Sequence, residues 1–86
     1  MNKDYSVLIS VSFPDVERVI DVYIPTTKTV AYVTLMLQKA IQETISSSYV
    51  INPNALLVNQ RTGEEYNPNK LIIETSIRNS TKLVLY

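Results

Sequence analysis

Residues 29–44, with the sequence TVAYVTLMLQKAIQET, decide the fold, because the hydrophobic pattern takes a helical period there. Four apolar residues recur at spacings of three or four and form one stripe of an amphipathic helix: Val30, Val33, Leu37 and Ile41. Thr29 lies directly before the stripe, where its hydroxyl can accept a hydrogen bond from a backbone N–H of the first helical turn. The pattern predicts a helix over residues 30–44, roughly 22 Å long, which is enough to cross one small sheet.

Two predicted strands precede this helix. Residues 5–13 alternate between apolar and mostly serine positions, and the apolar side is formed by Val7, Ile9, Val11 and Phe13. Residues 18–24 also alternate, with Ile20, Val22 and Ile24 inward and Val19, Asp21 and Tyr23 outward. The turn residues Pro14 and Asp15 are typical of a short connection, and Pro25 ends the second strand because it has no N–H for a sheet ladder. We expect a β-hairpin.

Three shorter strands are predicted after the helix, over residues 55–59, 64–66 and 82–86. In the first of these, Leu56 and Val58 point one way and Leu57 points the other, and we place Leu57 on the solvent face of the sheet. Gly63, the only glycine, is expected to take a positive φ in the turn before residues 64–66.

The predicted fold is a single α+β domain spanning residues 1–86, in the order ββαβββ. The helix covers one face of the sheet, since the chain has no other element that can do so. A helical turn within residues 70–74 brings Leu71 or Ile72 into the core, and Leu83 and Leu85 of the last strand point inward. The first and last strands are expected to be neighbours because both are apolar. This is the ubiquitin-like β-grasp arrangement, a mixed sheet of four to five strands packed on one central helix.

Composition argues against several classes of function. The chain has no cysteine and no histidine, so it has no thiol nucleophile, thiolate metal ligand or imidazole base. Eight basic and eight acidic residues cancel, which argues against a general electrostatic grip on nucleic acid or anionic lipid. No apolar stretch reaches the roughly 20 residues of a membrane helix, and the first residues lack the apolar core of a signal peptide. We predict a soluble cytoplasmic protein with no cofactor and no metal site.

Two short motifs contain groups that serve as catalysts in other proteins. Glu64 and Glu65 are adjacent, and adjacent strand residues point to opposite faces, so we interpret them as part of a solvated turn. Ser46, Ser47 and Ser48 have no histidine or cysteine to activate them. We therefore predict that the protein is not an enzyme.

Two segments resemble the ubiquitin superfamily. Residues 71–85, LIIETSIRNSTKLVL, have an apolar anchor, an isoleucine, a polar turn and a strand that reads Leu-Val-Leu. Residues 24–37, with Ile24-Pro25, Thr29-Val30, Val33 and Leu37, are similar to the entry from strand through cap to helix in the same fold. Within the superfamily the chain is most similar to the YukD/EsaB group, small ubiquitin-like proteins encoded with type VII (ESX/Ess-like) secretion systems of Gram-positive bacteria.

This resemblance implies a non-conjugated accessory or regulatory protein that acts by protein–protein interaction, through its sheet face or an edge strand. The implied partners are a membrane-bound ATPase or membrane-anchored subunits of the secretion machinery, which would recruit the protein to the inner face of the membrane. The alternatives are a ubiquitin-like adaptor unrelated to secretion and a modifier whose reactive tail is missing. Modifiers and sulfur carriers use a glycine carboxylate on a free tail, whereas the sequence stops at Tyr86, so we expect no conjugation.

The candidate protein-binding patch comprises four apolar residues: Leu8, Leu57, Val84 and Tyr86. Alternation predicts that Leu57, Val84 and Tyr86 share the solvent face of the sheet, with Leu8 nearby and Tyr23 as a further candidate. The corresponding face is the main recognition surface of ubiquitin, and contiguous exposed apolar residues mark partner sites. Single apolar residues scattered over a surface are ordinary, and they form the competing interpretation. Open sheet edges and an apolar face are also compatible with a homodimer.

Overall fold

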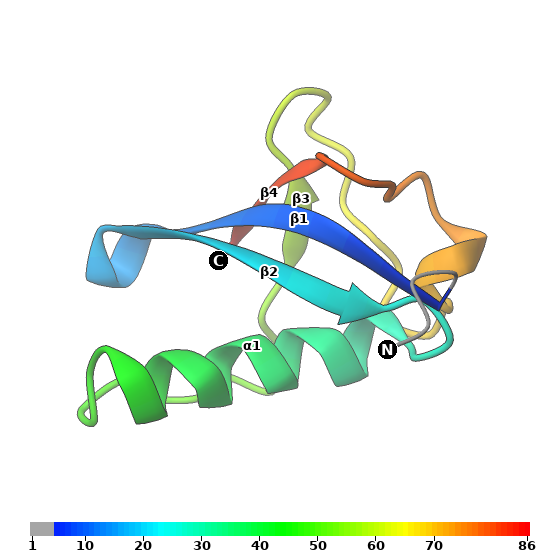
Figure 1. The fold of residues 1–86 in the computed structure, drawn as a ribbon. Coiled ribbons are helices and arrows are strands. Elements are labelled where there is room, and N and C mark those ends of the chain that lie inside the picture. Colours follow the sequence, from blue (N-terminus) through cyan, green and yellow to red (C-terminus); the bar gives the residue numbers. More distant parts are fainter. Residues whose placement is uncertain (1–4) are drawn as a thin grey trace.

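The computed structural model describes residues 5–86, which form a four-stranded sheet with one helix packed beneath it (Figure 1). The strands are β1 (Ser6–Phe13), β2 (Arg18–Pro25), β3 (Leu57–Asn59) and β4 (Lys82–Leu85), and the helix is α1 (Val30–Thr44). Single 3-10 turns, η2 (Pro14–Val16) and η3 (Ile72–Glu74), lie in two of the connections. The order across the sheet is β2-β1-β4-β3, with β1 and β4 parallel and the other neighbours antiparallel. The predicted α+β class and the pairing of first and last strands are confirmed.

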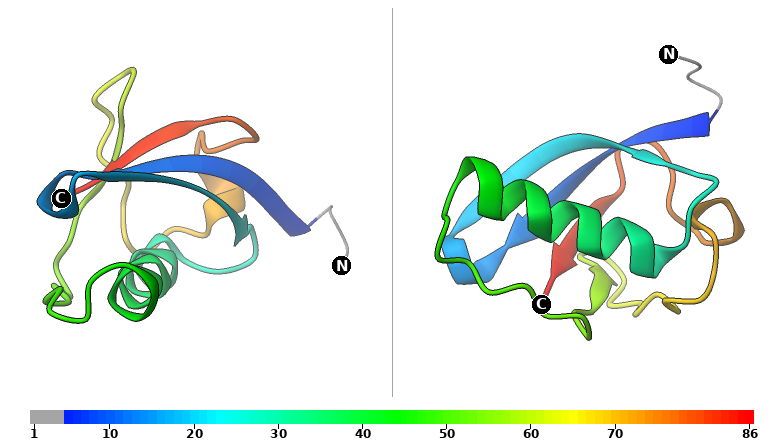
Figure 2. Two further views of the ribbon diagram at one scale, coloured as in Figure 1. Left: turned by 60° about the vertical axis from the view of Figure 1, so that its left-hand side comes forward. Right: turned by 90° about the horizontal axis from the view of Figure 1, so that it is seen from below.

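Helix α1 has the predicted bounds and the predicted cap. The side-chain oxygen of Thr29 accepts a hydrogen bond from the backbone N–H of Tyr32 at 3.1 Å. The four residues of the apolar stripe are at most 1% exposed. Seen from the helix side, α1 runs diagonally across the strands, so one stripe reaches several strands of the sheet (Figure 2).

The core lies between α1 and the inner face of the sheet. It contains Ile9, Val11 and Phe13 of β1, Ile24 of β2 and the predicted inward residues of β4, while Val7, Ile20 and Val22 are only half-buried. Ile72 of η3 is fully buried, which confirms the predicted helical turn and identifies the residue that it carries inward. Gly63 has a φ of +77°, as expected for its turn.

A buried glutamine fixes the long connection between α1 and β3. Gln38 is only 1% exposed, although its side chain is polar. Its Oε1 accepts hydrogen bonds from the Asn52 backbone N–H at 2.8 Å and from the Tyr49 hydroxyl at 3.2 Å, and its Nε2 donates to the Asn52 carbonyl at 3.0 Å. The amide group therefore uses both of its ends, which offsets the cost of burying it.

The predicted strand over residues 64–66 is wrong. Only one isolated bridge forms there, between Val58 and Glu65. Two backbone hydrogen bonds flank this bridge, from the Asn59 N–H to the Glu64 carbonyl at 2.8 Å and from the Tyr66 N–H to the Leu57 carbonyl at 3.0 Å. Side-chain contacts add to them: the buried Tyr66 hydroxyl lies 3.0 Å from Asn59 Nδ2 and 2.8 Å from Ser76 Oγ, which in turn donates to Glu64 Oε1 at 2.9 Å. Pairing with β3 is therefore limited to a single bridge, and short-range alternation in the sequence does not show this limit.

Candidate functional site

The sheet face that points away from α1 is assigned by the strand register. In the β3–β4 pair, Leu57 lies opposite Leu85, and Val58 lies opposite Val84. Directly opposed residues of an antiparallel pair point to the same face of the sheet. Leu85 is buried, so Leu57 also points to the core. Val58 and Val84 are consequently on the outer face.

The prediction that Leu57 lies on the solvent face is therefore wrong. Leu57 is 1% exposed and belongs to the core, whereas its neighbour Leu56 is 45% exposed. The alternation itself was correct, but its phase was reversed, and a reversed phase moves every side chain of a strand to the other face.

The β3–β4 ladder continues by one pair beyond the two strands. The Leu56 N–H donates to the Tyr86 carbonyl at 3.2 Å, and the Tyr86 N–H donates to the Leu56 carbonyl at 3.0 Å. Each of these residues is two positions from Val58 or Val84, so both lie on the outer face. We call the four residues Leu56, Val58, Val84 and Tyr86 the outer patch.

The outer patch combines exposed and covered apolar surface. Tyr86 is 63% exposed, Val58 is half-buried, and Val84 is 9% exposed because β4 is flanked by β1 and β3. None of the four side chains carries a charge at neutral pH. Two of the predicted site residues, Val84 and Tyr86, are thus brought together, and Leu56 and Val58 are the members that the sequence interpretation missed.

Leu8 lies on the same face but at the far end of it. On β1 it is four residues from Ser12, which pairs with Val84, and this spacing corresponds to roughly 13 Å. A polar row formed by Asp21, Ser10 and Lys82 crosses the sheet between the two ends. Leu8 instead pairs with Tyr23, and both are exposed, at 37% and 50%. Leu8 is therefore not part of the outer patch.

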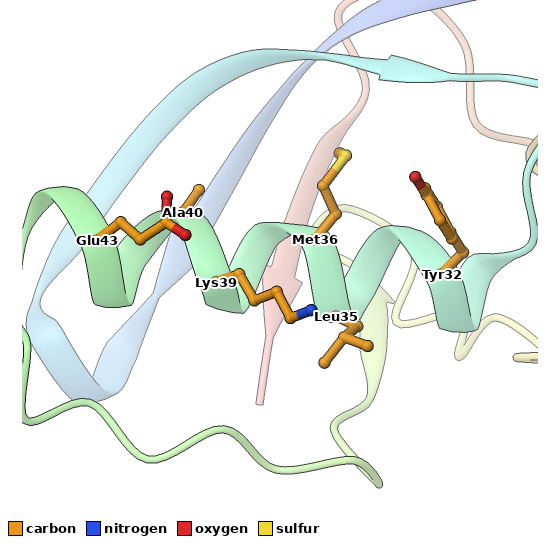
Figure 3. A pocket seen from close by; sticks show the side chains of 6 residues that line it. All are labelled: Tyr32, Leu35, Met36, Lys39, Ala40 and Glu43. Carbon is orange, nitrogen blue, oxygen red and sulfur yellow. The ribbon is translucent and has the colours of Figure 1, made fainter.

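A second apolar surface lies along the flank of α1 (Figure 3). It is a groove of about 360 Å³ lined by Tyr32, Leu35, Met36, Lys39, Ala40 and Glu43. Tyr32, Met36 and Ala40 point to the side on which β2 lies, whereas Leu35 and Lys39 point to the other side (Figure 3). The Lys28 Nζ lies 5.2 Å from the centre of the Tyr32 ring, which places a cation at one end of this surface.

The exposed side chains of the outer patch, Leu56 and Tyr86, are apolar or aromatic. Within residues 5–86, no group of three histidine, cysteine, aspartate or glutamate side chains is arranged to hold a metal ion. None of the helices formed by these residues has the length and apolar character needed to cross a membrane. Apolar side chains on an open sheet face suit contact with another protein.

Comparison with known proteins gives a likeness in structure. No protein-family model and no curated protein sequence matches this chain. A ubiquitin-like domain of an Arabidopsis thaliana protein superposes with a TM-score of 0.66 and 17% identity over 94% of this chain and 76% of that one. An N-terminal ubiquitin-like domain of another protein superposes with a TM-score of 0.67 and 13% identity, covering 95% and 74% of the two chains.

A chain of the MycP5-free ESX-5 inner membrane complex is also similar, with a TM-score of 0.78 and 14% identity. The match covers 95% of this protein and 21% of that chain, so the likeness concerns about a fifth of the larger protein. At these identities the shared property is the fold. The sheet order, the capped helix and the structural neighbours together show that the chain has a ubiquitin-like β-grasp fold.

Proposed function

We propose that this protein is a non-conjugated, YukD/EsaB-type accessory of a type VII secretion system, and that it acts without catalysis by binding another protein through its outer patch. The observation that supports the site most strongly is the location of Leu56 and Tyr86, two exposed apolar residues paired on the open sheet face. Exposed apolar side chains around a partly covered centre are typical of an interface core.

The likeness to a chain of the ESX-5 inner membrane complex supports the choice of machinery. The region of similarity is about a fifth of that larger chain, whereas it covers 95% of the present sequence. We infer that a protein of this kind works in the cytoplasm and joins the inner face of the membrane through a membrane-bound ATPase or a membrane-anchored subunit. The resemblance of residues 71–85 to the closing segment of ubiquitin-like proteins agrees with this assignment.

The experiment is complementation of a gene deletion in the host. Leu56→Asp and Tyr86→Asp each add a charge to the outer patch, and Val50→Asp is a matched control because Val50 is 82% exposed and lies outside the patch. We expect the two patch variants to lose export of the secretion substrates and copurification of the membrane components, and the control to retain both. Circular dichroism of each purified variant establishes that it is folded.

The alternatives give different results in the same strain. An adaptor unrelated to secretion leaves export unchanged when the gene is deleted. A modifier appears as covalent adducts of higher mass on a denaturing gel. Either result contradicts the proposed function.

A further inference from the structure

A polar cavity lies where the turn after β3 meets the segment that leads into β4. The turn rises above the sheet beside that segment (Figure 1). The cavity has a volume of about 640 Å³, and small-molecule sites in proteins have volumes of roughly 300–1,000 Å³. Hydroxyl and amide side chains line it together with three charged residues, Arg61, Glu64 and Lys82. None of the four outer-patch residues is among those that line it.

Hydrogen bonds fix the turn that forms one wall of the cavity. The Oδ1 atom of Asn59 accepts from the backbone N–H groups of Arg61 and Thr62, at 2.9 and 3.0 Å. The Asn59 carbonyl accepts from the Gly63 N–H at 2.8 Å, and Gly63 supplies the positive φ that this turn needs. Arg61 therefore lies on a turn whose backbone is held in place.

The opposite wall is held in the same way. The Arg78 backbone N–H donates to Thr81 Oγ1 at 2.9 Å, and the Thr81 N–H donates to the Arg78 carbonyl at 3.1 Å. Ser80 lies between them with a φ of +71°, a conformation that costs energy in a residue with a side chain. Its N–H donates to the Leu8 carbonyl at 2.7 Å, which attaches this wall to β1.

Two contacts join the walls to each other. The Gln60 N–H donates to the Lys82 carbonyl at 2.9 Å, and Ser76 Oγ donates to Glu64 Oε1 at 2.9 Å. Ser76 Oγ also lies 2.8 Å from the hydroxyl of the buried Tyr66, so the second contact is anchored in the core. The cavity is thus preformed, and a ligand does not have to order its walls on binding.

The charges of the cavity favour an anionic ligand. Arg61 and Lys82 provide two cations against the single carboxylate of Glu64. A guanidinium group binds phosphate through paired N–H groups, and a lysine ammonium binds it as a point charge. The formal net charge of the whole chain is zero, so this attraction is local to the cavity.

Glu64 restricts which anion the cavity suits. Its carboxylate repels a bare anion and accepts hydrogen bonds from hydroxyl groups. Further hydrogen-bonding side chains line the cavity, among them Thr62, Asn79 and Ser80. A polyol can make hydrogen bonds with such a lining, whereas an apolar ligand would leave these groups without partners.

We propose that this cavity binds a phosphorylated polyol, with the phosphate on Arg61 and Lys82 and the hydroxyl groups toward Glu64. Two sources provide this chemistry, a free sugar phosphate and the phosphoglycerol headgroup of a lipid. The inference goes beyond the proposed function and does not depend on it, because the outer patch takes no part in this site.

The first test titrates the ¹⁵N-labelled protein with glucose 6-phosphate, with inorganic phosphate and with glucose. We expect amide shifts in residues 59–64 and 76–82, and about tenfold tighter binding of glucose 6-phosphate than of the other two probes. Sedimentation with vesicles of phosphatidylglycerol, and not with vesicles of phosphatidylcholine, is the second arm. A response to glucose 6-phosphate identifies a free sugar phosphate as the source, and sedimentation alone identifies a lipid headgroup.

Two results of these titrations would overturn the proposal. If inorganic phosphate bound as tightly as glucose 6-phosphate, the cavity would bind a bare anion and not a polyol. If neither glucose 6-phosphate nor phosphatidylglycerol vesicles bound, the cavity would have no ligand of this class.

Substitution of the cations locates the binding. Arg61→Gln and Lys82→Gln each remove one charge from the cavity, and Arg18→Gln and Lys39→Gln are matched controls at exposed positions outside it. We expect each cavity variant to bind the responding probe at least about tenfold more weakly, and the controls to bind as the unchanged protein does. Equal weakening in the controls would contradict a site in the cavity. The amide spectrum of each variant establishes that it is folded.

Glu64→Gln tests the selection of a polyol. The substitution removes the charge and keeps an oxygen that can accept from Ser76 Oγ. Inorganic phosphate should bind about threefold more tightly to this variant because the repulsion is lost, so the preference for glucose 6-phosphate should narrow. For a lipid headgroup, inorganic phosphate should then compete more strongly with the vesicles. No gain in inorganic phosphate binding would refute the role assigned to Glu64.

Discussion

The register of β3 makes two adjacent leucines differ sharply in their contribution to stability. Leu57 is 1% exposed and packs in the core, whereas Leu56 is 45% exposed on the outer face. We predict that Leu57→Ala lowers the free energy of unfolding by about 2–5 kcal/mol, the range observed when a buried leucine is truncated. Leu56→Ala should cost less than about 1 kcal/mol, since much of its side chain contacts water in the folded state.

This difference is large compared with the total stability. A chain of 86 residues has roughly 4–13 kcal/mol of unfolding free energy, so Leu57→Ala removes a substantial share of it. The midpoint of thermal unfolding should fall by at least about 8 °C in Leu57→Ala. Urea denaturation followed by far-ultraviolet circular dichroism measures both variants, because the chain has no tryptophan to report on the core.

The order of the two values is the decisive result. If Leu56→Ala cost as much as Leu57→Ala or more, Leu56 would be the core residue and the outer patch would have the wrong members. An unchanged denaturant slope in both variants is the control that the native and unfolded states have kept their compactness.

Three further predictions concern groups that hold α1 and the segment after it. Gln38→Ala should destabilise the protein by about 1–3 kcal/mol, measured by urea unfolding, because it removes a buried side chain and the three hydrogen bonds that this side chain makes with Asn52 and Tyr49. Burial, and then the Asp15 carboxylate, raise the pKa of the Tyr49 hydroxyl above 10.0. The neutral hydroxyl therefore stabilises the folded state below about pH 10, and this stabilisation is lost as the pH rises through the folded-state pKa. Unfolding free energy should therefore fall in that alkaline range, and Tyr49→Phe should reduce the fall; an identical pH profile would contradict this. Thr29→Ala should cost about 1 kcal/mol through loss of the helix cap, and Thr29→Ser, the matched control, should cost little.

The sequence was sufficient for the elements whose pattern is local. The stripe from Val30 to Ile41 and the cap at Thr29 predicted the helix, and regular alternation predicted the β1–β2 hairpin. These predictions succeed because the side-chain repeat of a helix or a strand can be read from residues that are close together in the sequence.

The errors concern features set by contacts between distant residues. Leu56, Leu57 and Val58 are all apolar, so the pattern showed that they alternate but not which of them faces the core. That choice depends on pairing with Leu85, 28 positions after Leu57. Gln38 shows the same difficulty, because its partners lie in an irregular connection that has no sequence period.

The most direct test of the proposed function is photo-crosslinking from the outer patch in living host cells. A photoreactive amino acid replaces Leu56 in one strain and Val50 in another, since both positions are exposed. We predict that position 56 crosslinks to a membrane-bound ATPase or a membrane-anchored subunit of the type VII machinery and that position 50 does not. The same products from both positions, or none to that machinery from position 56, would contradict the proposal that the outer patch binds it.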